Sequence, residues 1–328
     1  MDELEDRLGP DIPSIAQPKP EELAYDLDGK LSSVLSLRTS IPDDAFTAGT
    51  LGTERGGSGA LIREDGLVLT IGYLITEAES IWLFDSNNRA VPAHTVGYDQ
   101  ESGFGLVQAL QPLDLPALEL GNSGNLRTGD PVVMAGCGGR AHAVSSQIVA
   151  RREFAGYWEY LLDNAIFTAP PHPLWGGAAL IGADGTLRGI GSLFVQQARE
   201  GGTPIDVNMV VPIDLLKPIM AELLQFGRTR KPPRPWLGML TTEVDDRIVV
   251  AGVVDGGPAQ DADIQLGDII LGIGGKQVAD MASMFRHVWS MGEAGVEIPL
   301  DLQREGDAFQ IHVRSISRSD RLKAPKLH

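Results

Sequence analysis

The sequence GSGALIREDGLVLT, residues 57–70, decides the fold of this chain. Two short apolar runs, 60–62 and 67–69, flank the dipeptide Asp65-Gly66. Aspartate and glycine tolerate the positive φ angles that tight turns require, so this spacing predicts two antiparallel β-strands joined as a hairpin.

Outward from the hairpin, the same pattern continues from residue 31 to residue 212. Short apolar runs alternate with turn residues about every ten positions, which is typical of all-β domains. One helix is predicted after Asp214, because apolar residues recur at helical spacing until Gly227 ends the pattern. Further strands are expected over residues 80–84, 131–135, 146–149 and 207–211.

A basic, proline-rich segment separates two domains. Residues 228–235, RTRKPPRP, contain no apolar side chain and are typical of a linker. They divide a first domain over 31–227 from a second over 236–316, and a loose basic tail is expected over 317–328. In the second domain, strands are predicted over 248–254, 269–273, 297–303 and 308–313, with a helix over 281–289.

Length and charge restrict the function classes. The chain has 328 residues, which at ~150 residues per domain predicts about two domains, and its formal net charge is -17. Residues 1–30 hold nine acidic and three basic residues besides four prolines, so we expect an extended or disordered acidic arm, or a docking or oligomerisation segment. The acidic excess disfavours partners such as nucleic acid and anionic lipid.

No apolar run approaches the ~18 residues of a membrane-spanning helix, so no membrane insertion is expected. The first residues, MDELEDRLGP, lack the basic flank and apolar stretch of a secretory signal, which predicts a cytoplasmic protein. The single cysteine, Cys137, excludes an intrachain disulfide and a zinc site of several thiolates. Because no histidines stand at ligand spacing, no metal or other cofactor is predicted.

Several phrases together resemble the HtrA family of trypsin-like serine proteases with a C-terminal PDZ domain. The similarity runs from about residue 31 to residue 316 and implies a mainly β protein, with a trypsin-like double β-barrel followed by an α+β PDZ domain. The matching phrases are the hairpin over 57–70, LELGNS over 118–123, GDPVV over 129–133, VVPIDLLKPI over 210–219, GPA over 257–259 and LGDII over 266–270.

The family's catalytic motifs match positions that carry other residues. Its T-N-x-H-V motif matches residues 70–74, which puts Tyr73 at the histidine position. Its T-D-L-A-L motif puts Gly103 at the aspartate position, and its G-N-S-G-G motif puts Trp175 at the serine position. Pro173 matches a glycine whose N–H belongs to the family's oxyanion hole, and proline has no N–H.

Acyl transfer on this fold needs a serine nucleophile, a histidine base and an orienting aspartate. A phenol with a pKa near 10 is no general base at neutral pH. We therefore expect a catalytically inactive, HtrA-like pseudoprotease that is no enzyme and that acts as a scaffold, adaptor or assembly subunit.

Three alternatives stay open. An active serine-type peptidase could use displaced residues, namely His172 with a hydroxyl such as Ser58 or Thr168. A cysteine nucleophile, Cys137 with His142 as its base, is the second alternative. Cys137 is otherwise a small, semi-buried residue. The third alternative is a holdase chaperone, which suppresses aggregation without cleavage.

The two aromatic residues at catalytic positions have two interpretations. Aromatic side chains bury roughly 150–250 Å² each, so Tyr73 and Trp175 could together fill the former cleft as a plug. Alternatively, both have drifted and lie on the surface.

The second domain carries a candidate peptide site. PDZ domains add an extended peptide to a sheet edge while backbone N–H groups hold its terminal carboxylate. Trp236, Leu237, Gly238 and Met239 match that carboxylate loop, since glycine permits close approach. With Met284 and Val288 from the predicted helix, they would form an adaptable apolar pocket.

Partners are therefore expected to be proteins or peptides bound in the PDZ groove. The alternative is a PDZ fold kept only for packing, with its groove covered. The resemblance also implies a homotrimer, or a place as a subunit in a larger complex. Three basic residues beside the loop either favour acidic ligands or belong to a solvated linker, and they are Arg230, Lys231 and Arg234.

Overall fold

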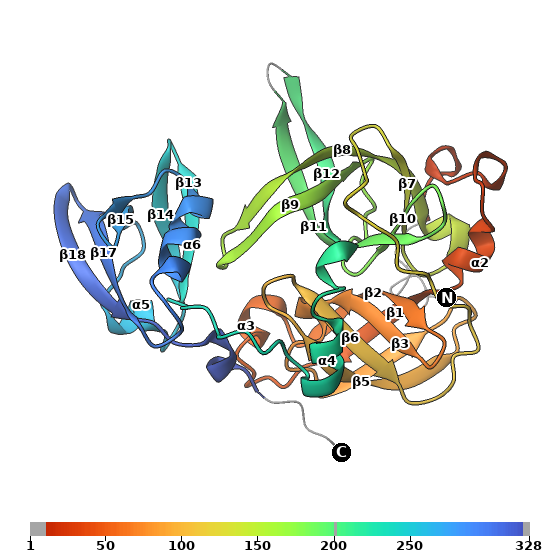
Figure 1. Ribbon diagram of the computed structural model, residues 1–328, viewed down its shortest axis with the longest axis horizontal. Helices are drawn as coiled ribbons and strands as arrows, with labels where there is room; N and C mark the ends of the chain where they lie inside the picture. The colour runs from red at the N-terminus through yellow and green to blue at the C-terminus, as the bar shows by residue number, and fades with distance from the viewer. Residues whose placement is uncertain (1–10, 200–201, 324–328) are drawn as a thin grey trace. The chain divides into compact units, whose positions relative to one another are not determined.

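The computed structural model describes residues 11–199 and 202–323 and divides into two compact units (Figure 1). The first ten residues of the predicted acidic arm and the last five of the predicted tail lie outside the described residues. The first unit consists of three segments, which are the residues up to Arg152, Asn164–Thr229, and the residues from Lys323. The second takes in Glu153–Asp163 and Arg230–Leu322.

The predicted hairpin forms β2 and β3, two neighbouring strands of a closed six-stranded barrel with strand order β1-β2-β3-β6-β5-β4. Ala60 pairs with Leu69 across the hairpin, and Gly66 adopts a φ of 92° in the turn. Every residue of β3 is buried. The strands are β1 (Val34–Ser40), β2 (Glu54–Arg63), β3 (Leu67–Ile71), β4 (Ser80–Phe84), β5 (Ala90–Tyr98) and β6 (Phe104–Ala109).

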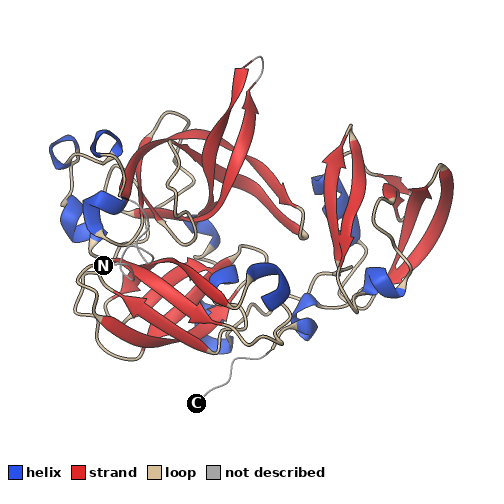
Figure 2. Ribbon diagram, turned by 180° about the vertical axis from the view of Figure 1, so that it is seen from behind, coloured by secondary structure: helices blue, strands red, loops and turns tan. Residues whose placement is uncertain are grey.

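A second closed barrel follows, with strand order β10-β11-β12-β9-β8-β7, so the first unit is mainly β as expected (Figure 2). Its interior includes Met134, Ile148, Ile166, Leu180 and Val210, all of them 0% exposed. The strands are β7 (Pro131–Ala135), β8 (Ala143–Gly156), β9 (Tyr160–Ala169), β10 (Ala179–Ile181), β11 (Leu187–Arg199) and β12 (Gly202–Pro212).

The single helix predicted after Asp214 is interrupted. The chain forms a 3-10 turn, η5 (Ile213–Leu215), and then α4 (Met220–Phe226), which Gly227 ends with a φ of 70°. Pro218 lies between the two, and proline lacks the N–H that a continuous helix requires. Short helical turns elsewhere in this unit are α3 (Ala48–Leu51), η3 (Gly72–Leu74) and η4 (Gly139–His142).

Residues 11–30 are folded, and the expectation of an extended arm is wrong for this part. They form η1 (Ser14–Ala16), η2 (Pro20–Glu22) and the start of α2 (Leu27–Leu31). Ile12 packs in the second barrel, and Arg140 donates to Asp28. Apolar burial and ion pairing thus order the segment despite its charge.

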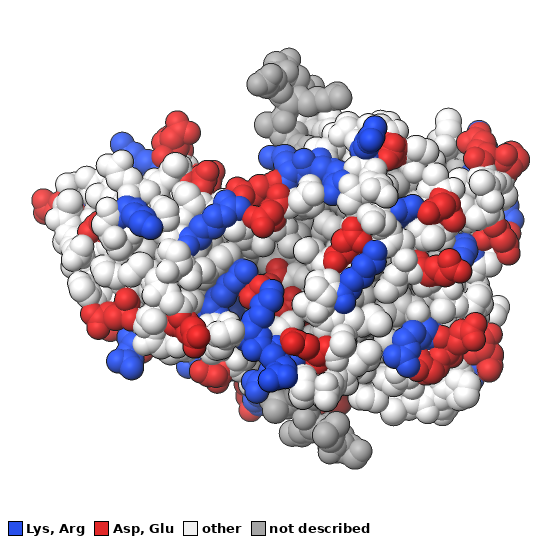
Figure 3. All heavy atoms as spheres, in the orientation of Figure 1, with Lys and Arg blue, Asp and Glu red and all other residues white. Residues whose placement is uncertain are grey.

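Acidic and basic side chains are interspersed over the face drawn in Figure 3.

The second unit contains a sheet of order β13-β14-β15-β17-β18, in which β16 pairs with β15. Asp280 and Ser283 form a capping box at the start of α6, which ends one residue beyond the predicted helix. The elements are β13 (Met239–Val244), β14 (Arg247–Val253), β15 (Ile269–Ile273), β16 (Lys276–Gln277), β17 (Glu297–Arg304), β18 (Asp307–Arg314), α5 (Pro258–Asp261), α6 (Met281–Ser290) and η6 (Arg318–Arg321).

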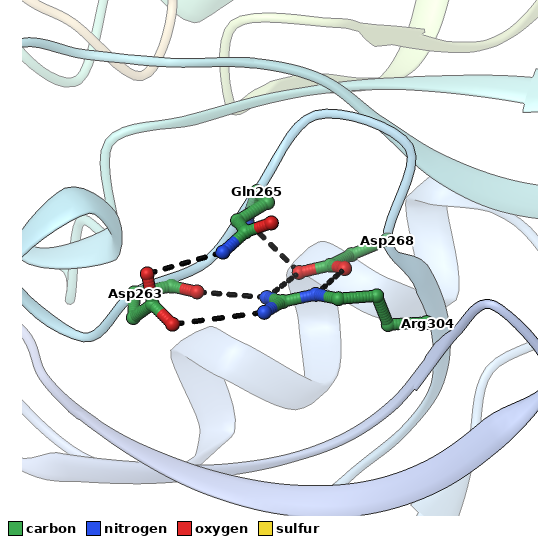
Figure 4. Close-up of polar contacts among 4 residues, drawn as sticks. All are labelled: Asp263, Gln265, Asp268 and Arg304. Atoms are coloured by element: carbon green, nitrogen blue, oxygen red, sulfur yellow. Dashed lines mark hydrogen bonds and ion pairs between the residues drawn. The ribbon is translucent and has the colours of Figure 1, made fainter.

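One buried carboxylate joins the α5–β15 loop to the far end of β17. Asp268 is 1% exposed and accepts two hydrogen bonds from Arg304, at 2.7 and 2.8 Å (Figure 4). Arg304 also donates to the carbonyl of Asp263, and Asp268 accepts from the N–H of Gln265. Hydrogen bonding to Arg304 and Gln265 holds the pKa of Asp268 below its usual value against the effect of burial.

Asp268→Asn should destabilise the second unit by about 1–3 kcal/mol, because two charge-assisted hydrogen bonds lose their charge. Since the pKa of Asp268 is lowered on folding, its contribution is present above an unfolded pKa of about 3.9 and is lost as the pH falls through the folded value. Urea unfolding between pH 2 and 7 measures this, with Asp307→Asn as an exposed control. Equal stability of the two variants at pH 7 would contradict it.

Candidate functional site

Tyr73 lies in η3, directly after β3 of the first barrel. Its hydroxyl donates to the carbonyl of Ser192 at 2.9 Å and is hydrogen-bonded to the Trp175 side chain. Because an indole only donates, the phenol oxygen accepts the bond from Trp175. Burial raises the pKa of Tyr73 above its usual value, so the phenol keeps its proton at neutral pH.

Trp175 lies in the loop between β9 and β10 and is half-buried, with its ring centroid 5.5 Å from that of Phe194. The loop approaches the first barrel closely, since the Ser58 N–H donates to the Gly176 carbonyl at 2.8 Å. Gly177 has a φ of 79°, and a Cβ there would lie 1.8 Å from the Ser58 carbonyl oxygen. The Trp175 side chain contacts Tyr73 and Phe194, and the plug interpretation stays a prediction.

Gly103 forms a tight turn before β6. Its φ is 82°, its N–H donates to the Asp99 carbonyl, and its carbonyl accepts from the Gly72 N–H at 2.7 Å. Residues with a side chain adopt this left-handed conformation at a cost. Pro173, at the predicted oxyanion position, is exposed.

Of the displaced candidates for nucleophile and base, His172 and Cys137 have backbone partners, whereas the Thr168 hydroxyl is buried without a hydrogen-bond partner. His172 is 1% exposed, with Nε2 at 3.0 Å from the His142 carbonyl and Nδ1 accepting from the Leu174 N–H at 3.0 Å. Backbone groups thus occupy both ring nitrogens, and burial lowers the pKa of His172. The Cys137 thiol is buried and donates to the Phe84 carbonyl. Among the described residues no group of acidic, histidine or cysteine side chains could hold a metal.

The predicted carboxylate loop lies directly before β13. Gly238 has a φ of 73°, which supports the sharp bend expected of it. The apolar groove residues predicted from the sequence are all buried; Leu237, Met239, Met284 and Val288 belong to one apolar core, and Trp236 is 6% exposed.

A carboxylate that the sequence did not reveal faces this loop. Glu159 lies in the turn between β8 and β9, a segment that belongs to the same compact unit as the loop. Its carboxylate accepts from the Leu237 N–H at 3.2 Å and from the Gly238 N–H at 3.0 Å, and it is also bonded to the backbone of Met239. The only sequence signal was the aromatic Tyr157-Trp158-Glu159-Tyr160 stretch in a long hairpin.

Burial raises the pKa of Glu159 to about 7, although three backbone N–H groups and the charge of Arg318 act in the opposite direction. The carboxyl group at this loop therefore titrates near neutral pH.

Comparisons with known proteins agree with this fold. A family model of trypsin-like peptidase domains matches residues 57–190, and one of PDZ domains matches residues 235–314. A probable periplasmic serine endoprotease DegP-like from Pseudomonas fulva is 28% identical over 291 residues, covering 84% of this chain. The periplasmic serine endoprotease DegP of Salmonella typhimurium is 29% identical over 272 residues, covering 78%. The chain spans 59% and 56% of the length of these relatives.

Solved structures support the fold alone. The HtrA-type protease AlgW with decapeptide has a TM-score of 0.53 and 22% identity, and the match covers 90% of this chain and 99% of that one. The same protease with tripeptide has a TM-score of 0.52 at 22% identity, covering 90% and 98%.

The names of the DegP relatives contradict two expectations from the sequence. They are named serine endoproteases, which contradicts the prediction of an inactive scaffold that is no enzyme and favours the peptidase alternative. That prediction depended on four positions, whereas the similarity extends over most of the chain. The match of Tyr73, Gly103 and Trp175 to the triad stays a prediction. The relatives are also named periplasmic, which contradicts the cytoplasmic prediction. In the described part of the chain, no helix is long and apolar enough to cross a membrane.

The Glu159 contact should make the second unit less stable as the pH rises. Because the folded pKa of about 7 exceeds the ordinary value of 4.5, the contribution is complete below pH 4.5 and is lost as the pH rises through 7, by up to about 3 kcal/mol. Urea unfolding at pH 4.5–8 should show this decline in the natural chain and none in Glu159→Gln, which cannot titrate. Parallel pH profiles would contradict the prediction.

Proposed function

We propose that this chain, which pairs an HtrA-like trypsin-like peptidase domain with a PDZ domain, binds the free carboxyl termini of peptides and unfolded proteins through the PDZ domain. The observation that carries the proposal is the convergence of the Leu237 and Gly238 N–H groups on a carboxylate. A loop whose amides hold the Glu159 carboxylate has the donors that a peptide terminus requires.

The edge of the sheet supports an extended ligand. β13 is the terminal strand of its sheet, and the backbone groups of such an edge can pair with another strand. The Thr241 N–H on that strand already donates to the Tyr157 carbonyl at 3.2 Å. A peptide that adds to this edge would place its last residue at the carboxylate loop.

The side chains beside the loop favour an apolar last residue. Leu237, Met239, Met284 and Val288 are each no more than 2% exposed and pack together. Methionine adapts its shape readily, so two methionines favour tolerance among hydrophobic termini. The solved AlgW structures with a decapeptide and a tripeptide support a peptide ligand. A homotrimer, or assembly into a larger complex, belongs to the same proposal through the resemblance to the family.

Peptides ending in a free hydrophobic residue should bind roughly 10–100-fold more tightly than their C-terminal amides, because amidation removes charge-assisted hydrogen bonds. Fluorescence anisotropy on the full chain measures this. Leu237→Glu should abolish binding, while Leu266→Glu at a 73% exposed position should leave it unchanged. Equal affinity for the peptide with a free C-terminus and for its amide would contradict the proposal. This comparison uses the natural chain, so it does not depend on whether the Leu237→Glu variant folds.

Peptide-bond hydrolysis is a second candidate function, supported by the names of the relatives. On this chain His172 is the histidine nearest in sequence to the matched nucleophile position. Its two nitrogens now face backbone groups, so catalysis would require this ring to turn toward Ser58 or Thr168.

If the chain is a peptidase of this kind, it should cleave unfolded casein and react with a serine-directed fluorophosphonate. Both signals should disappear in His172→Ala and persist in His94→Ala, which changes an exposed histidine. Absence of cleavage and of labelling in the natural chain would overturn this second candidate, and suppressed aggregation in the same assay would favour the holdase alternative.

A further inference from the structure

The carboxylate loop of the second unit is occupied by the chain itself. Glu159 accepts from the Leu237 and Gly238 N–H groups at 3.2 and 3.0 Å, and a second oxygen of the same carboxylate lies 3.4 Å from the Leu237 nitrogen. Those N–H groups have no capacity for a second carboxylate at the same place, since each carries one proton.

The hairpin tip also occupies the strand position of a ligand. Two residues before Glu159, the Tyr157 carbonyl accepts from the Thr241 N–H on β13. An extended peptide held by its terminus would require the same backbone donor. The tip thus makes the two kinds of contact that a peptide ligand would make, a backbone bond to β13 and a carboxyl group at the loop. The carboxyl group comes from a side chain and not from a chain terminus.

Further contacts hold the tip within this unit. Arg286 on α6 pairs with Glu153 and Asp163, one on each strand of the hairpin. Ala155 and Leu161 pack against the apolar core of the unit. The Arg318 guanidinium donates to the Trp158 carbonyl at 3.5 Å, and the Trp158 and Tyr160 rings are stacked with centroids 5.6 Å apart.

We infer that the hairpin tip, residues 157–160, is a built-in competitor of the PDZ site, and that a peptide carboxyl terminus binds only by displacing Glu159. This inference rests on the proposed peptide-binding function. The Glu159 carboxyl group and a peptide carboxylate exclude each other because both require the same N–H donors. The affinity observed for a peptide is then its affinity for the open groove, multiplied by the fraction of molecules in which the tip is released.

The competition depends on pH. Glu159 faces Arg318 and the backbone N–H groups of the loop, and burial raises its pKa to about 7. The released side chain has an ordinary pKa near 4.5, so the docked tip is favoured in acid and is weakened as the pH rises toward 7. A peptide terminus with a pKa near 3.5 stays charged throughout this range.

The test measures binding of fluorescein-labelled decapeptides ending in valine, leucine, isoleucine or phenylalanine to the full chain at pH 5.0–8.0. The natural chain should bind at least tenfold more tightly at pH 8.0 than at pH 5.0. Glu159→Ala should bind at least tenfold more tightly than the natural chain at pH 5.0 and show no such pH dependence. Glu159→Gln, which resembles the protonated acid, should stay weak across the range.

Glu305→Ala is the matched control, because Glu305 is exposed and shares the positive φ of Glu159, 51° against 61°. It should bind as the natural chain does. Equal affinities and pH profiles for the natural chain and Glu159→Ala would overturn the competitor while leaving peptide binding intact. Absence of binding by Glu159→Ala and the natural chain alike would overturn the proposed function, and the inference with it.

Discussion

An open sheet edge is the constraint on which the functional part of this structure depends. Both barrels of the first unit are closed, so each of their strands has two neighbours. The sheet of the second unit is open, and β13 pairs only with β14. An unpaired edge attracts another strand, and here the Tyr157 carbonyl and the Glu159 carboxylate take the backbone donors of β13 and its preceding loop.

The first unit has the architecture of a trypsin-like peptidase domain. Tyr73 and Trp175 form a hydrogen-bonded pair that also reaches the Ser192 carbonyl. A Cβ at Gly177 would collide with the Ser58 carbonyl oxygen, and a Cβ at Gly176 would lie 2.8 Å from the Tyr73 hydroxyl oxygen. The relatives that match this chain are named serine endoproteases.

Local patterns predicted the elements well where one face or turn defines them. The β2–β3 hairpin depends on Asp65-Gly66 between apolar runs, and α6 follows a capping box and an apolar spacing. The same reasoning failed over residues 11–30, because it weighed charge and proline and missed that Ile12 is buried against the second barrel. It also missed the interruption of the helix at Pro218. Proline lacks the N–H that a continuous helix requires, although the apolar residues keep their helical spacing past it.

By itself, the sequence determined a β-rich first domain and an apolar loop at Trp236–Met239, because each follows from residues close together in the chain. The double barrel and the PDZ fold followed from the resemblance to a known family. Only the tertiary structure decided what lies in that loop. Glu159 and the N–H groups that it meets are 78 and 79 residues apart, and no local period relates them. The contact exists because a long hairpin ends beside an open edge, and burial there changes the chemistry of an ordinary glutamate.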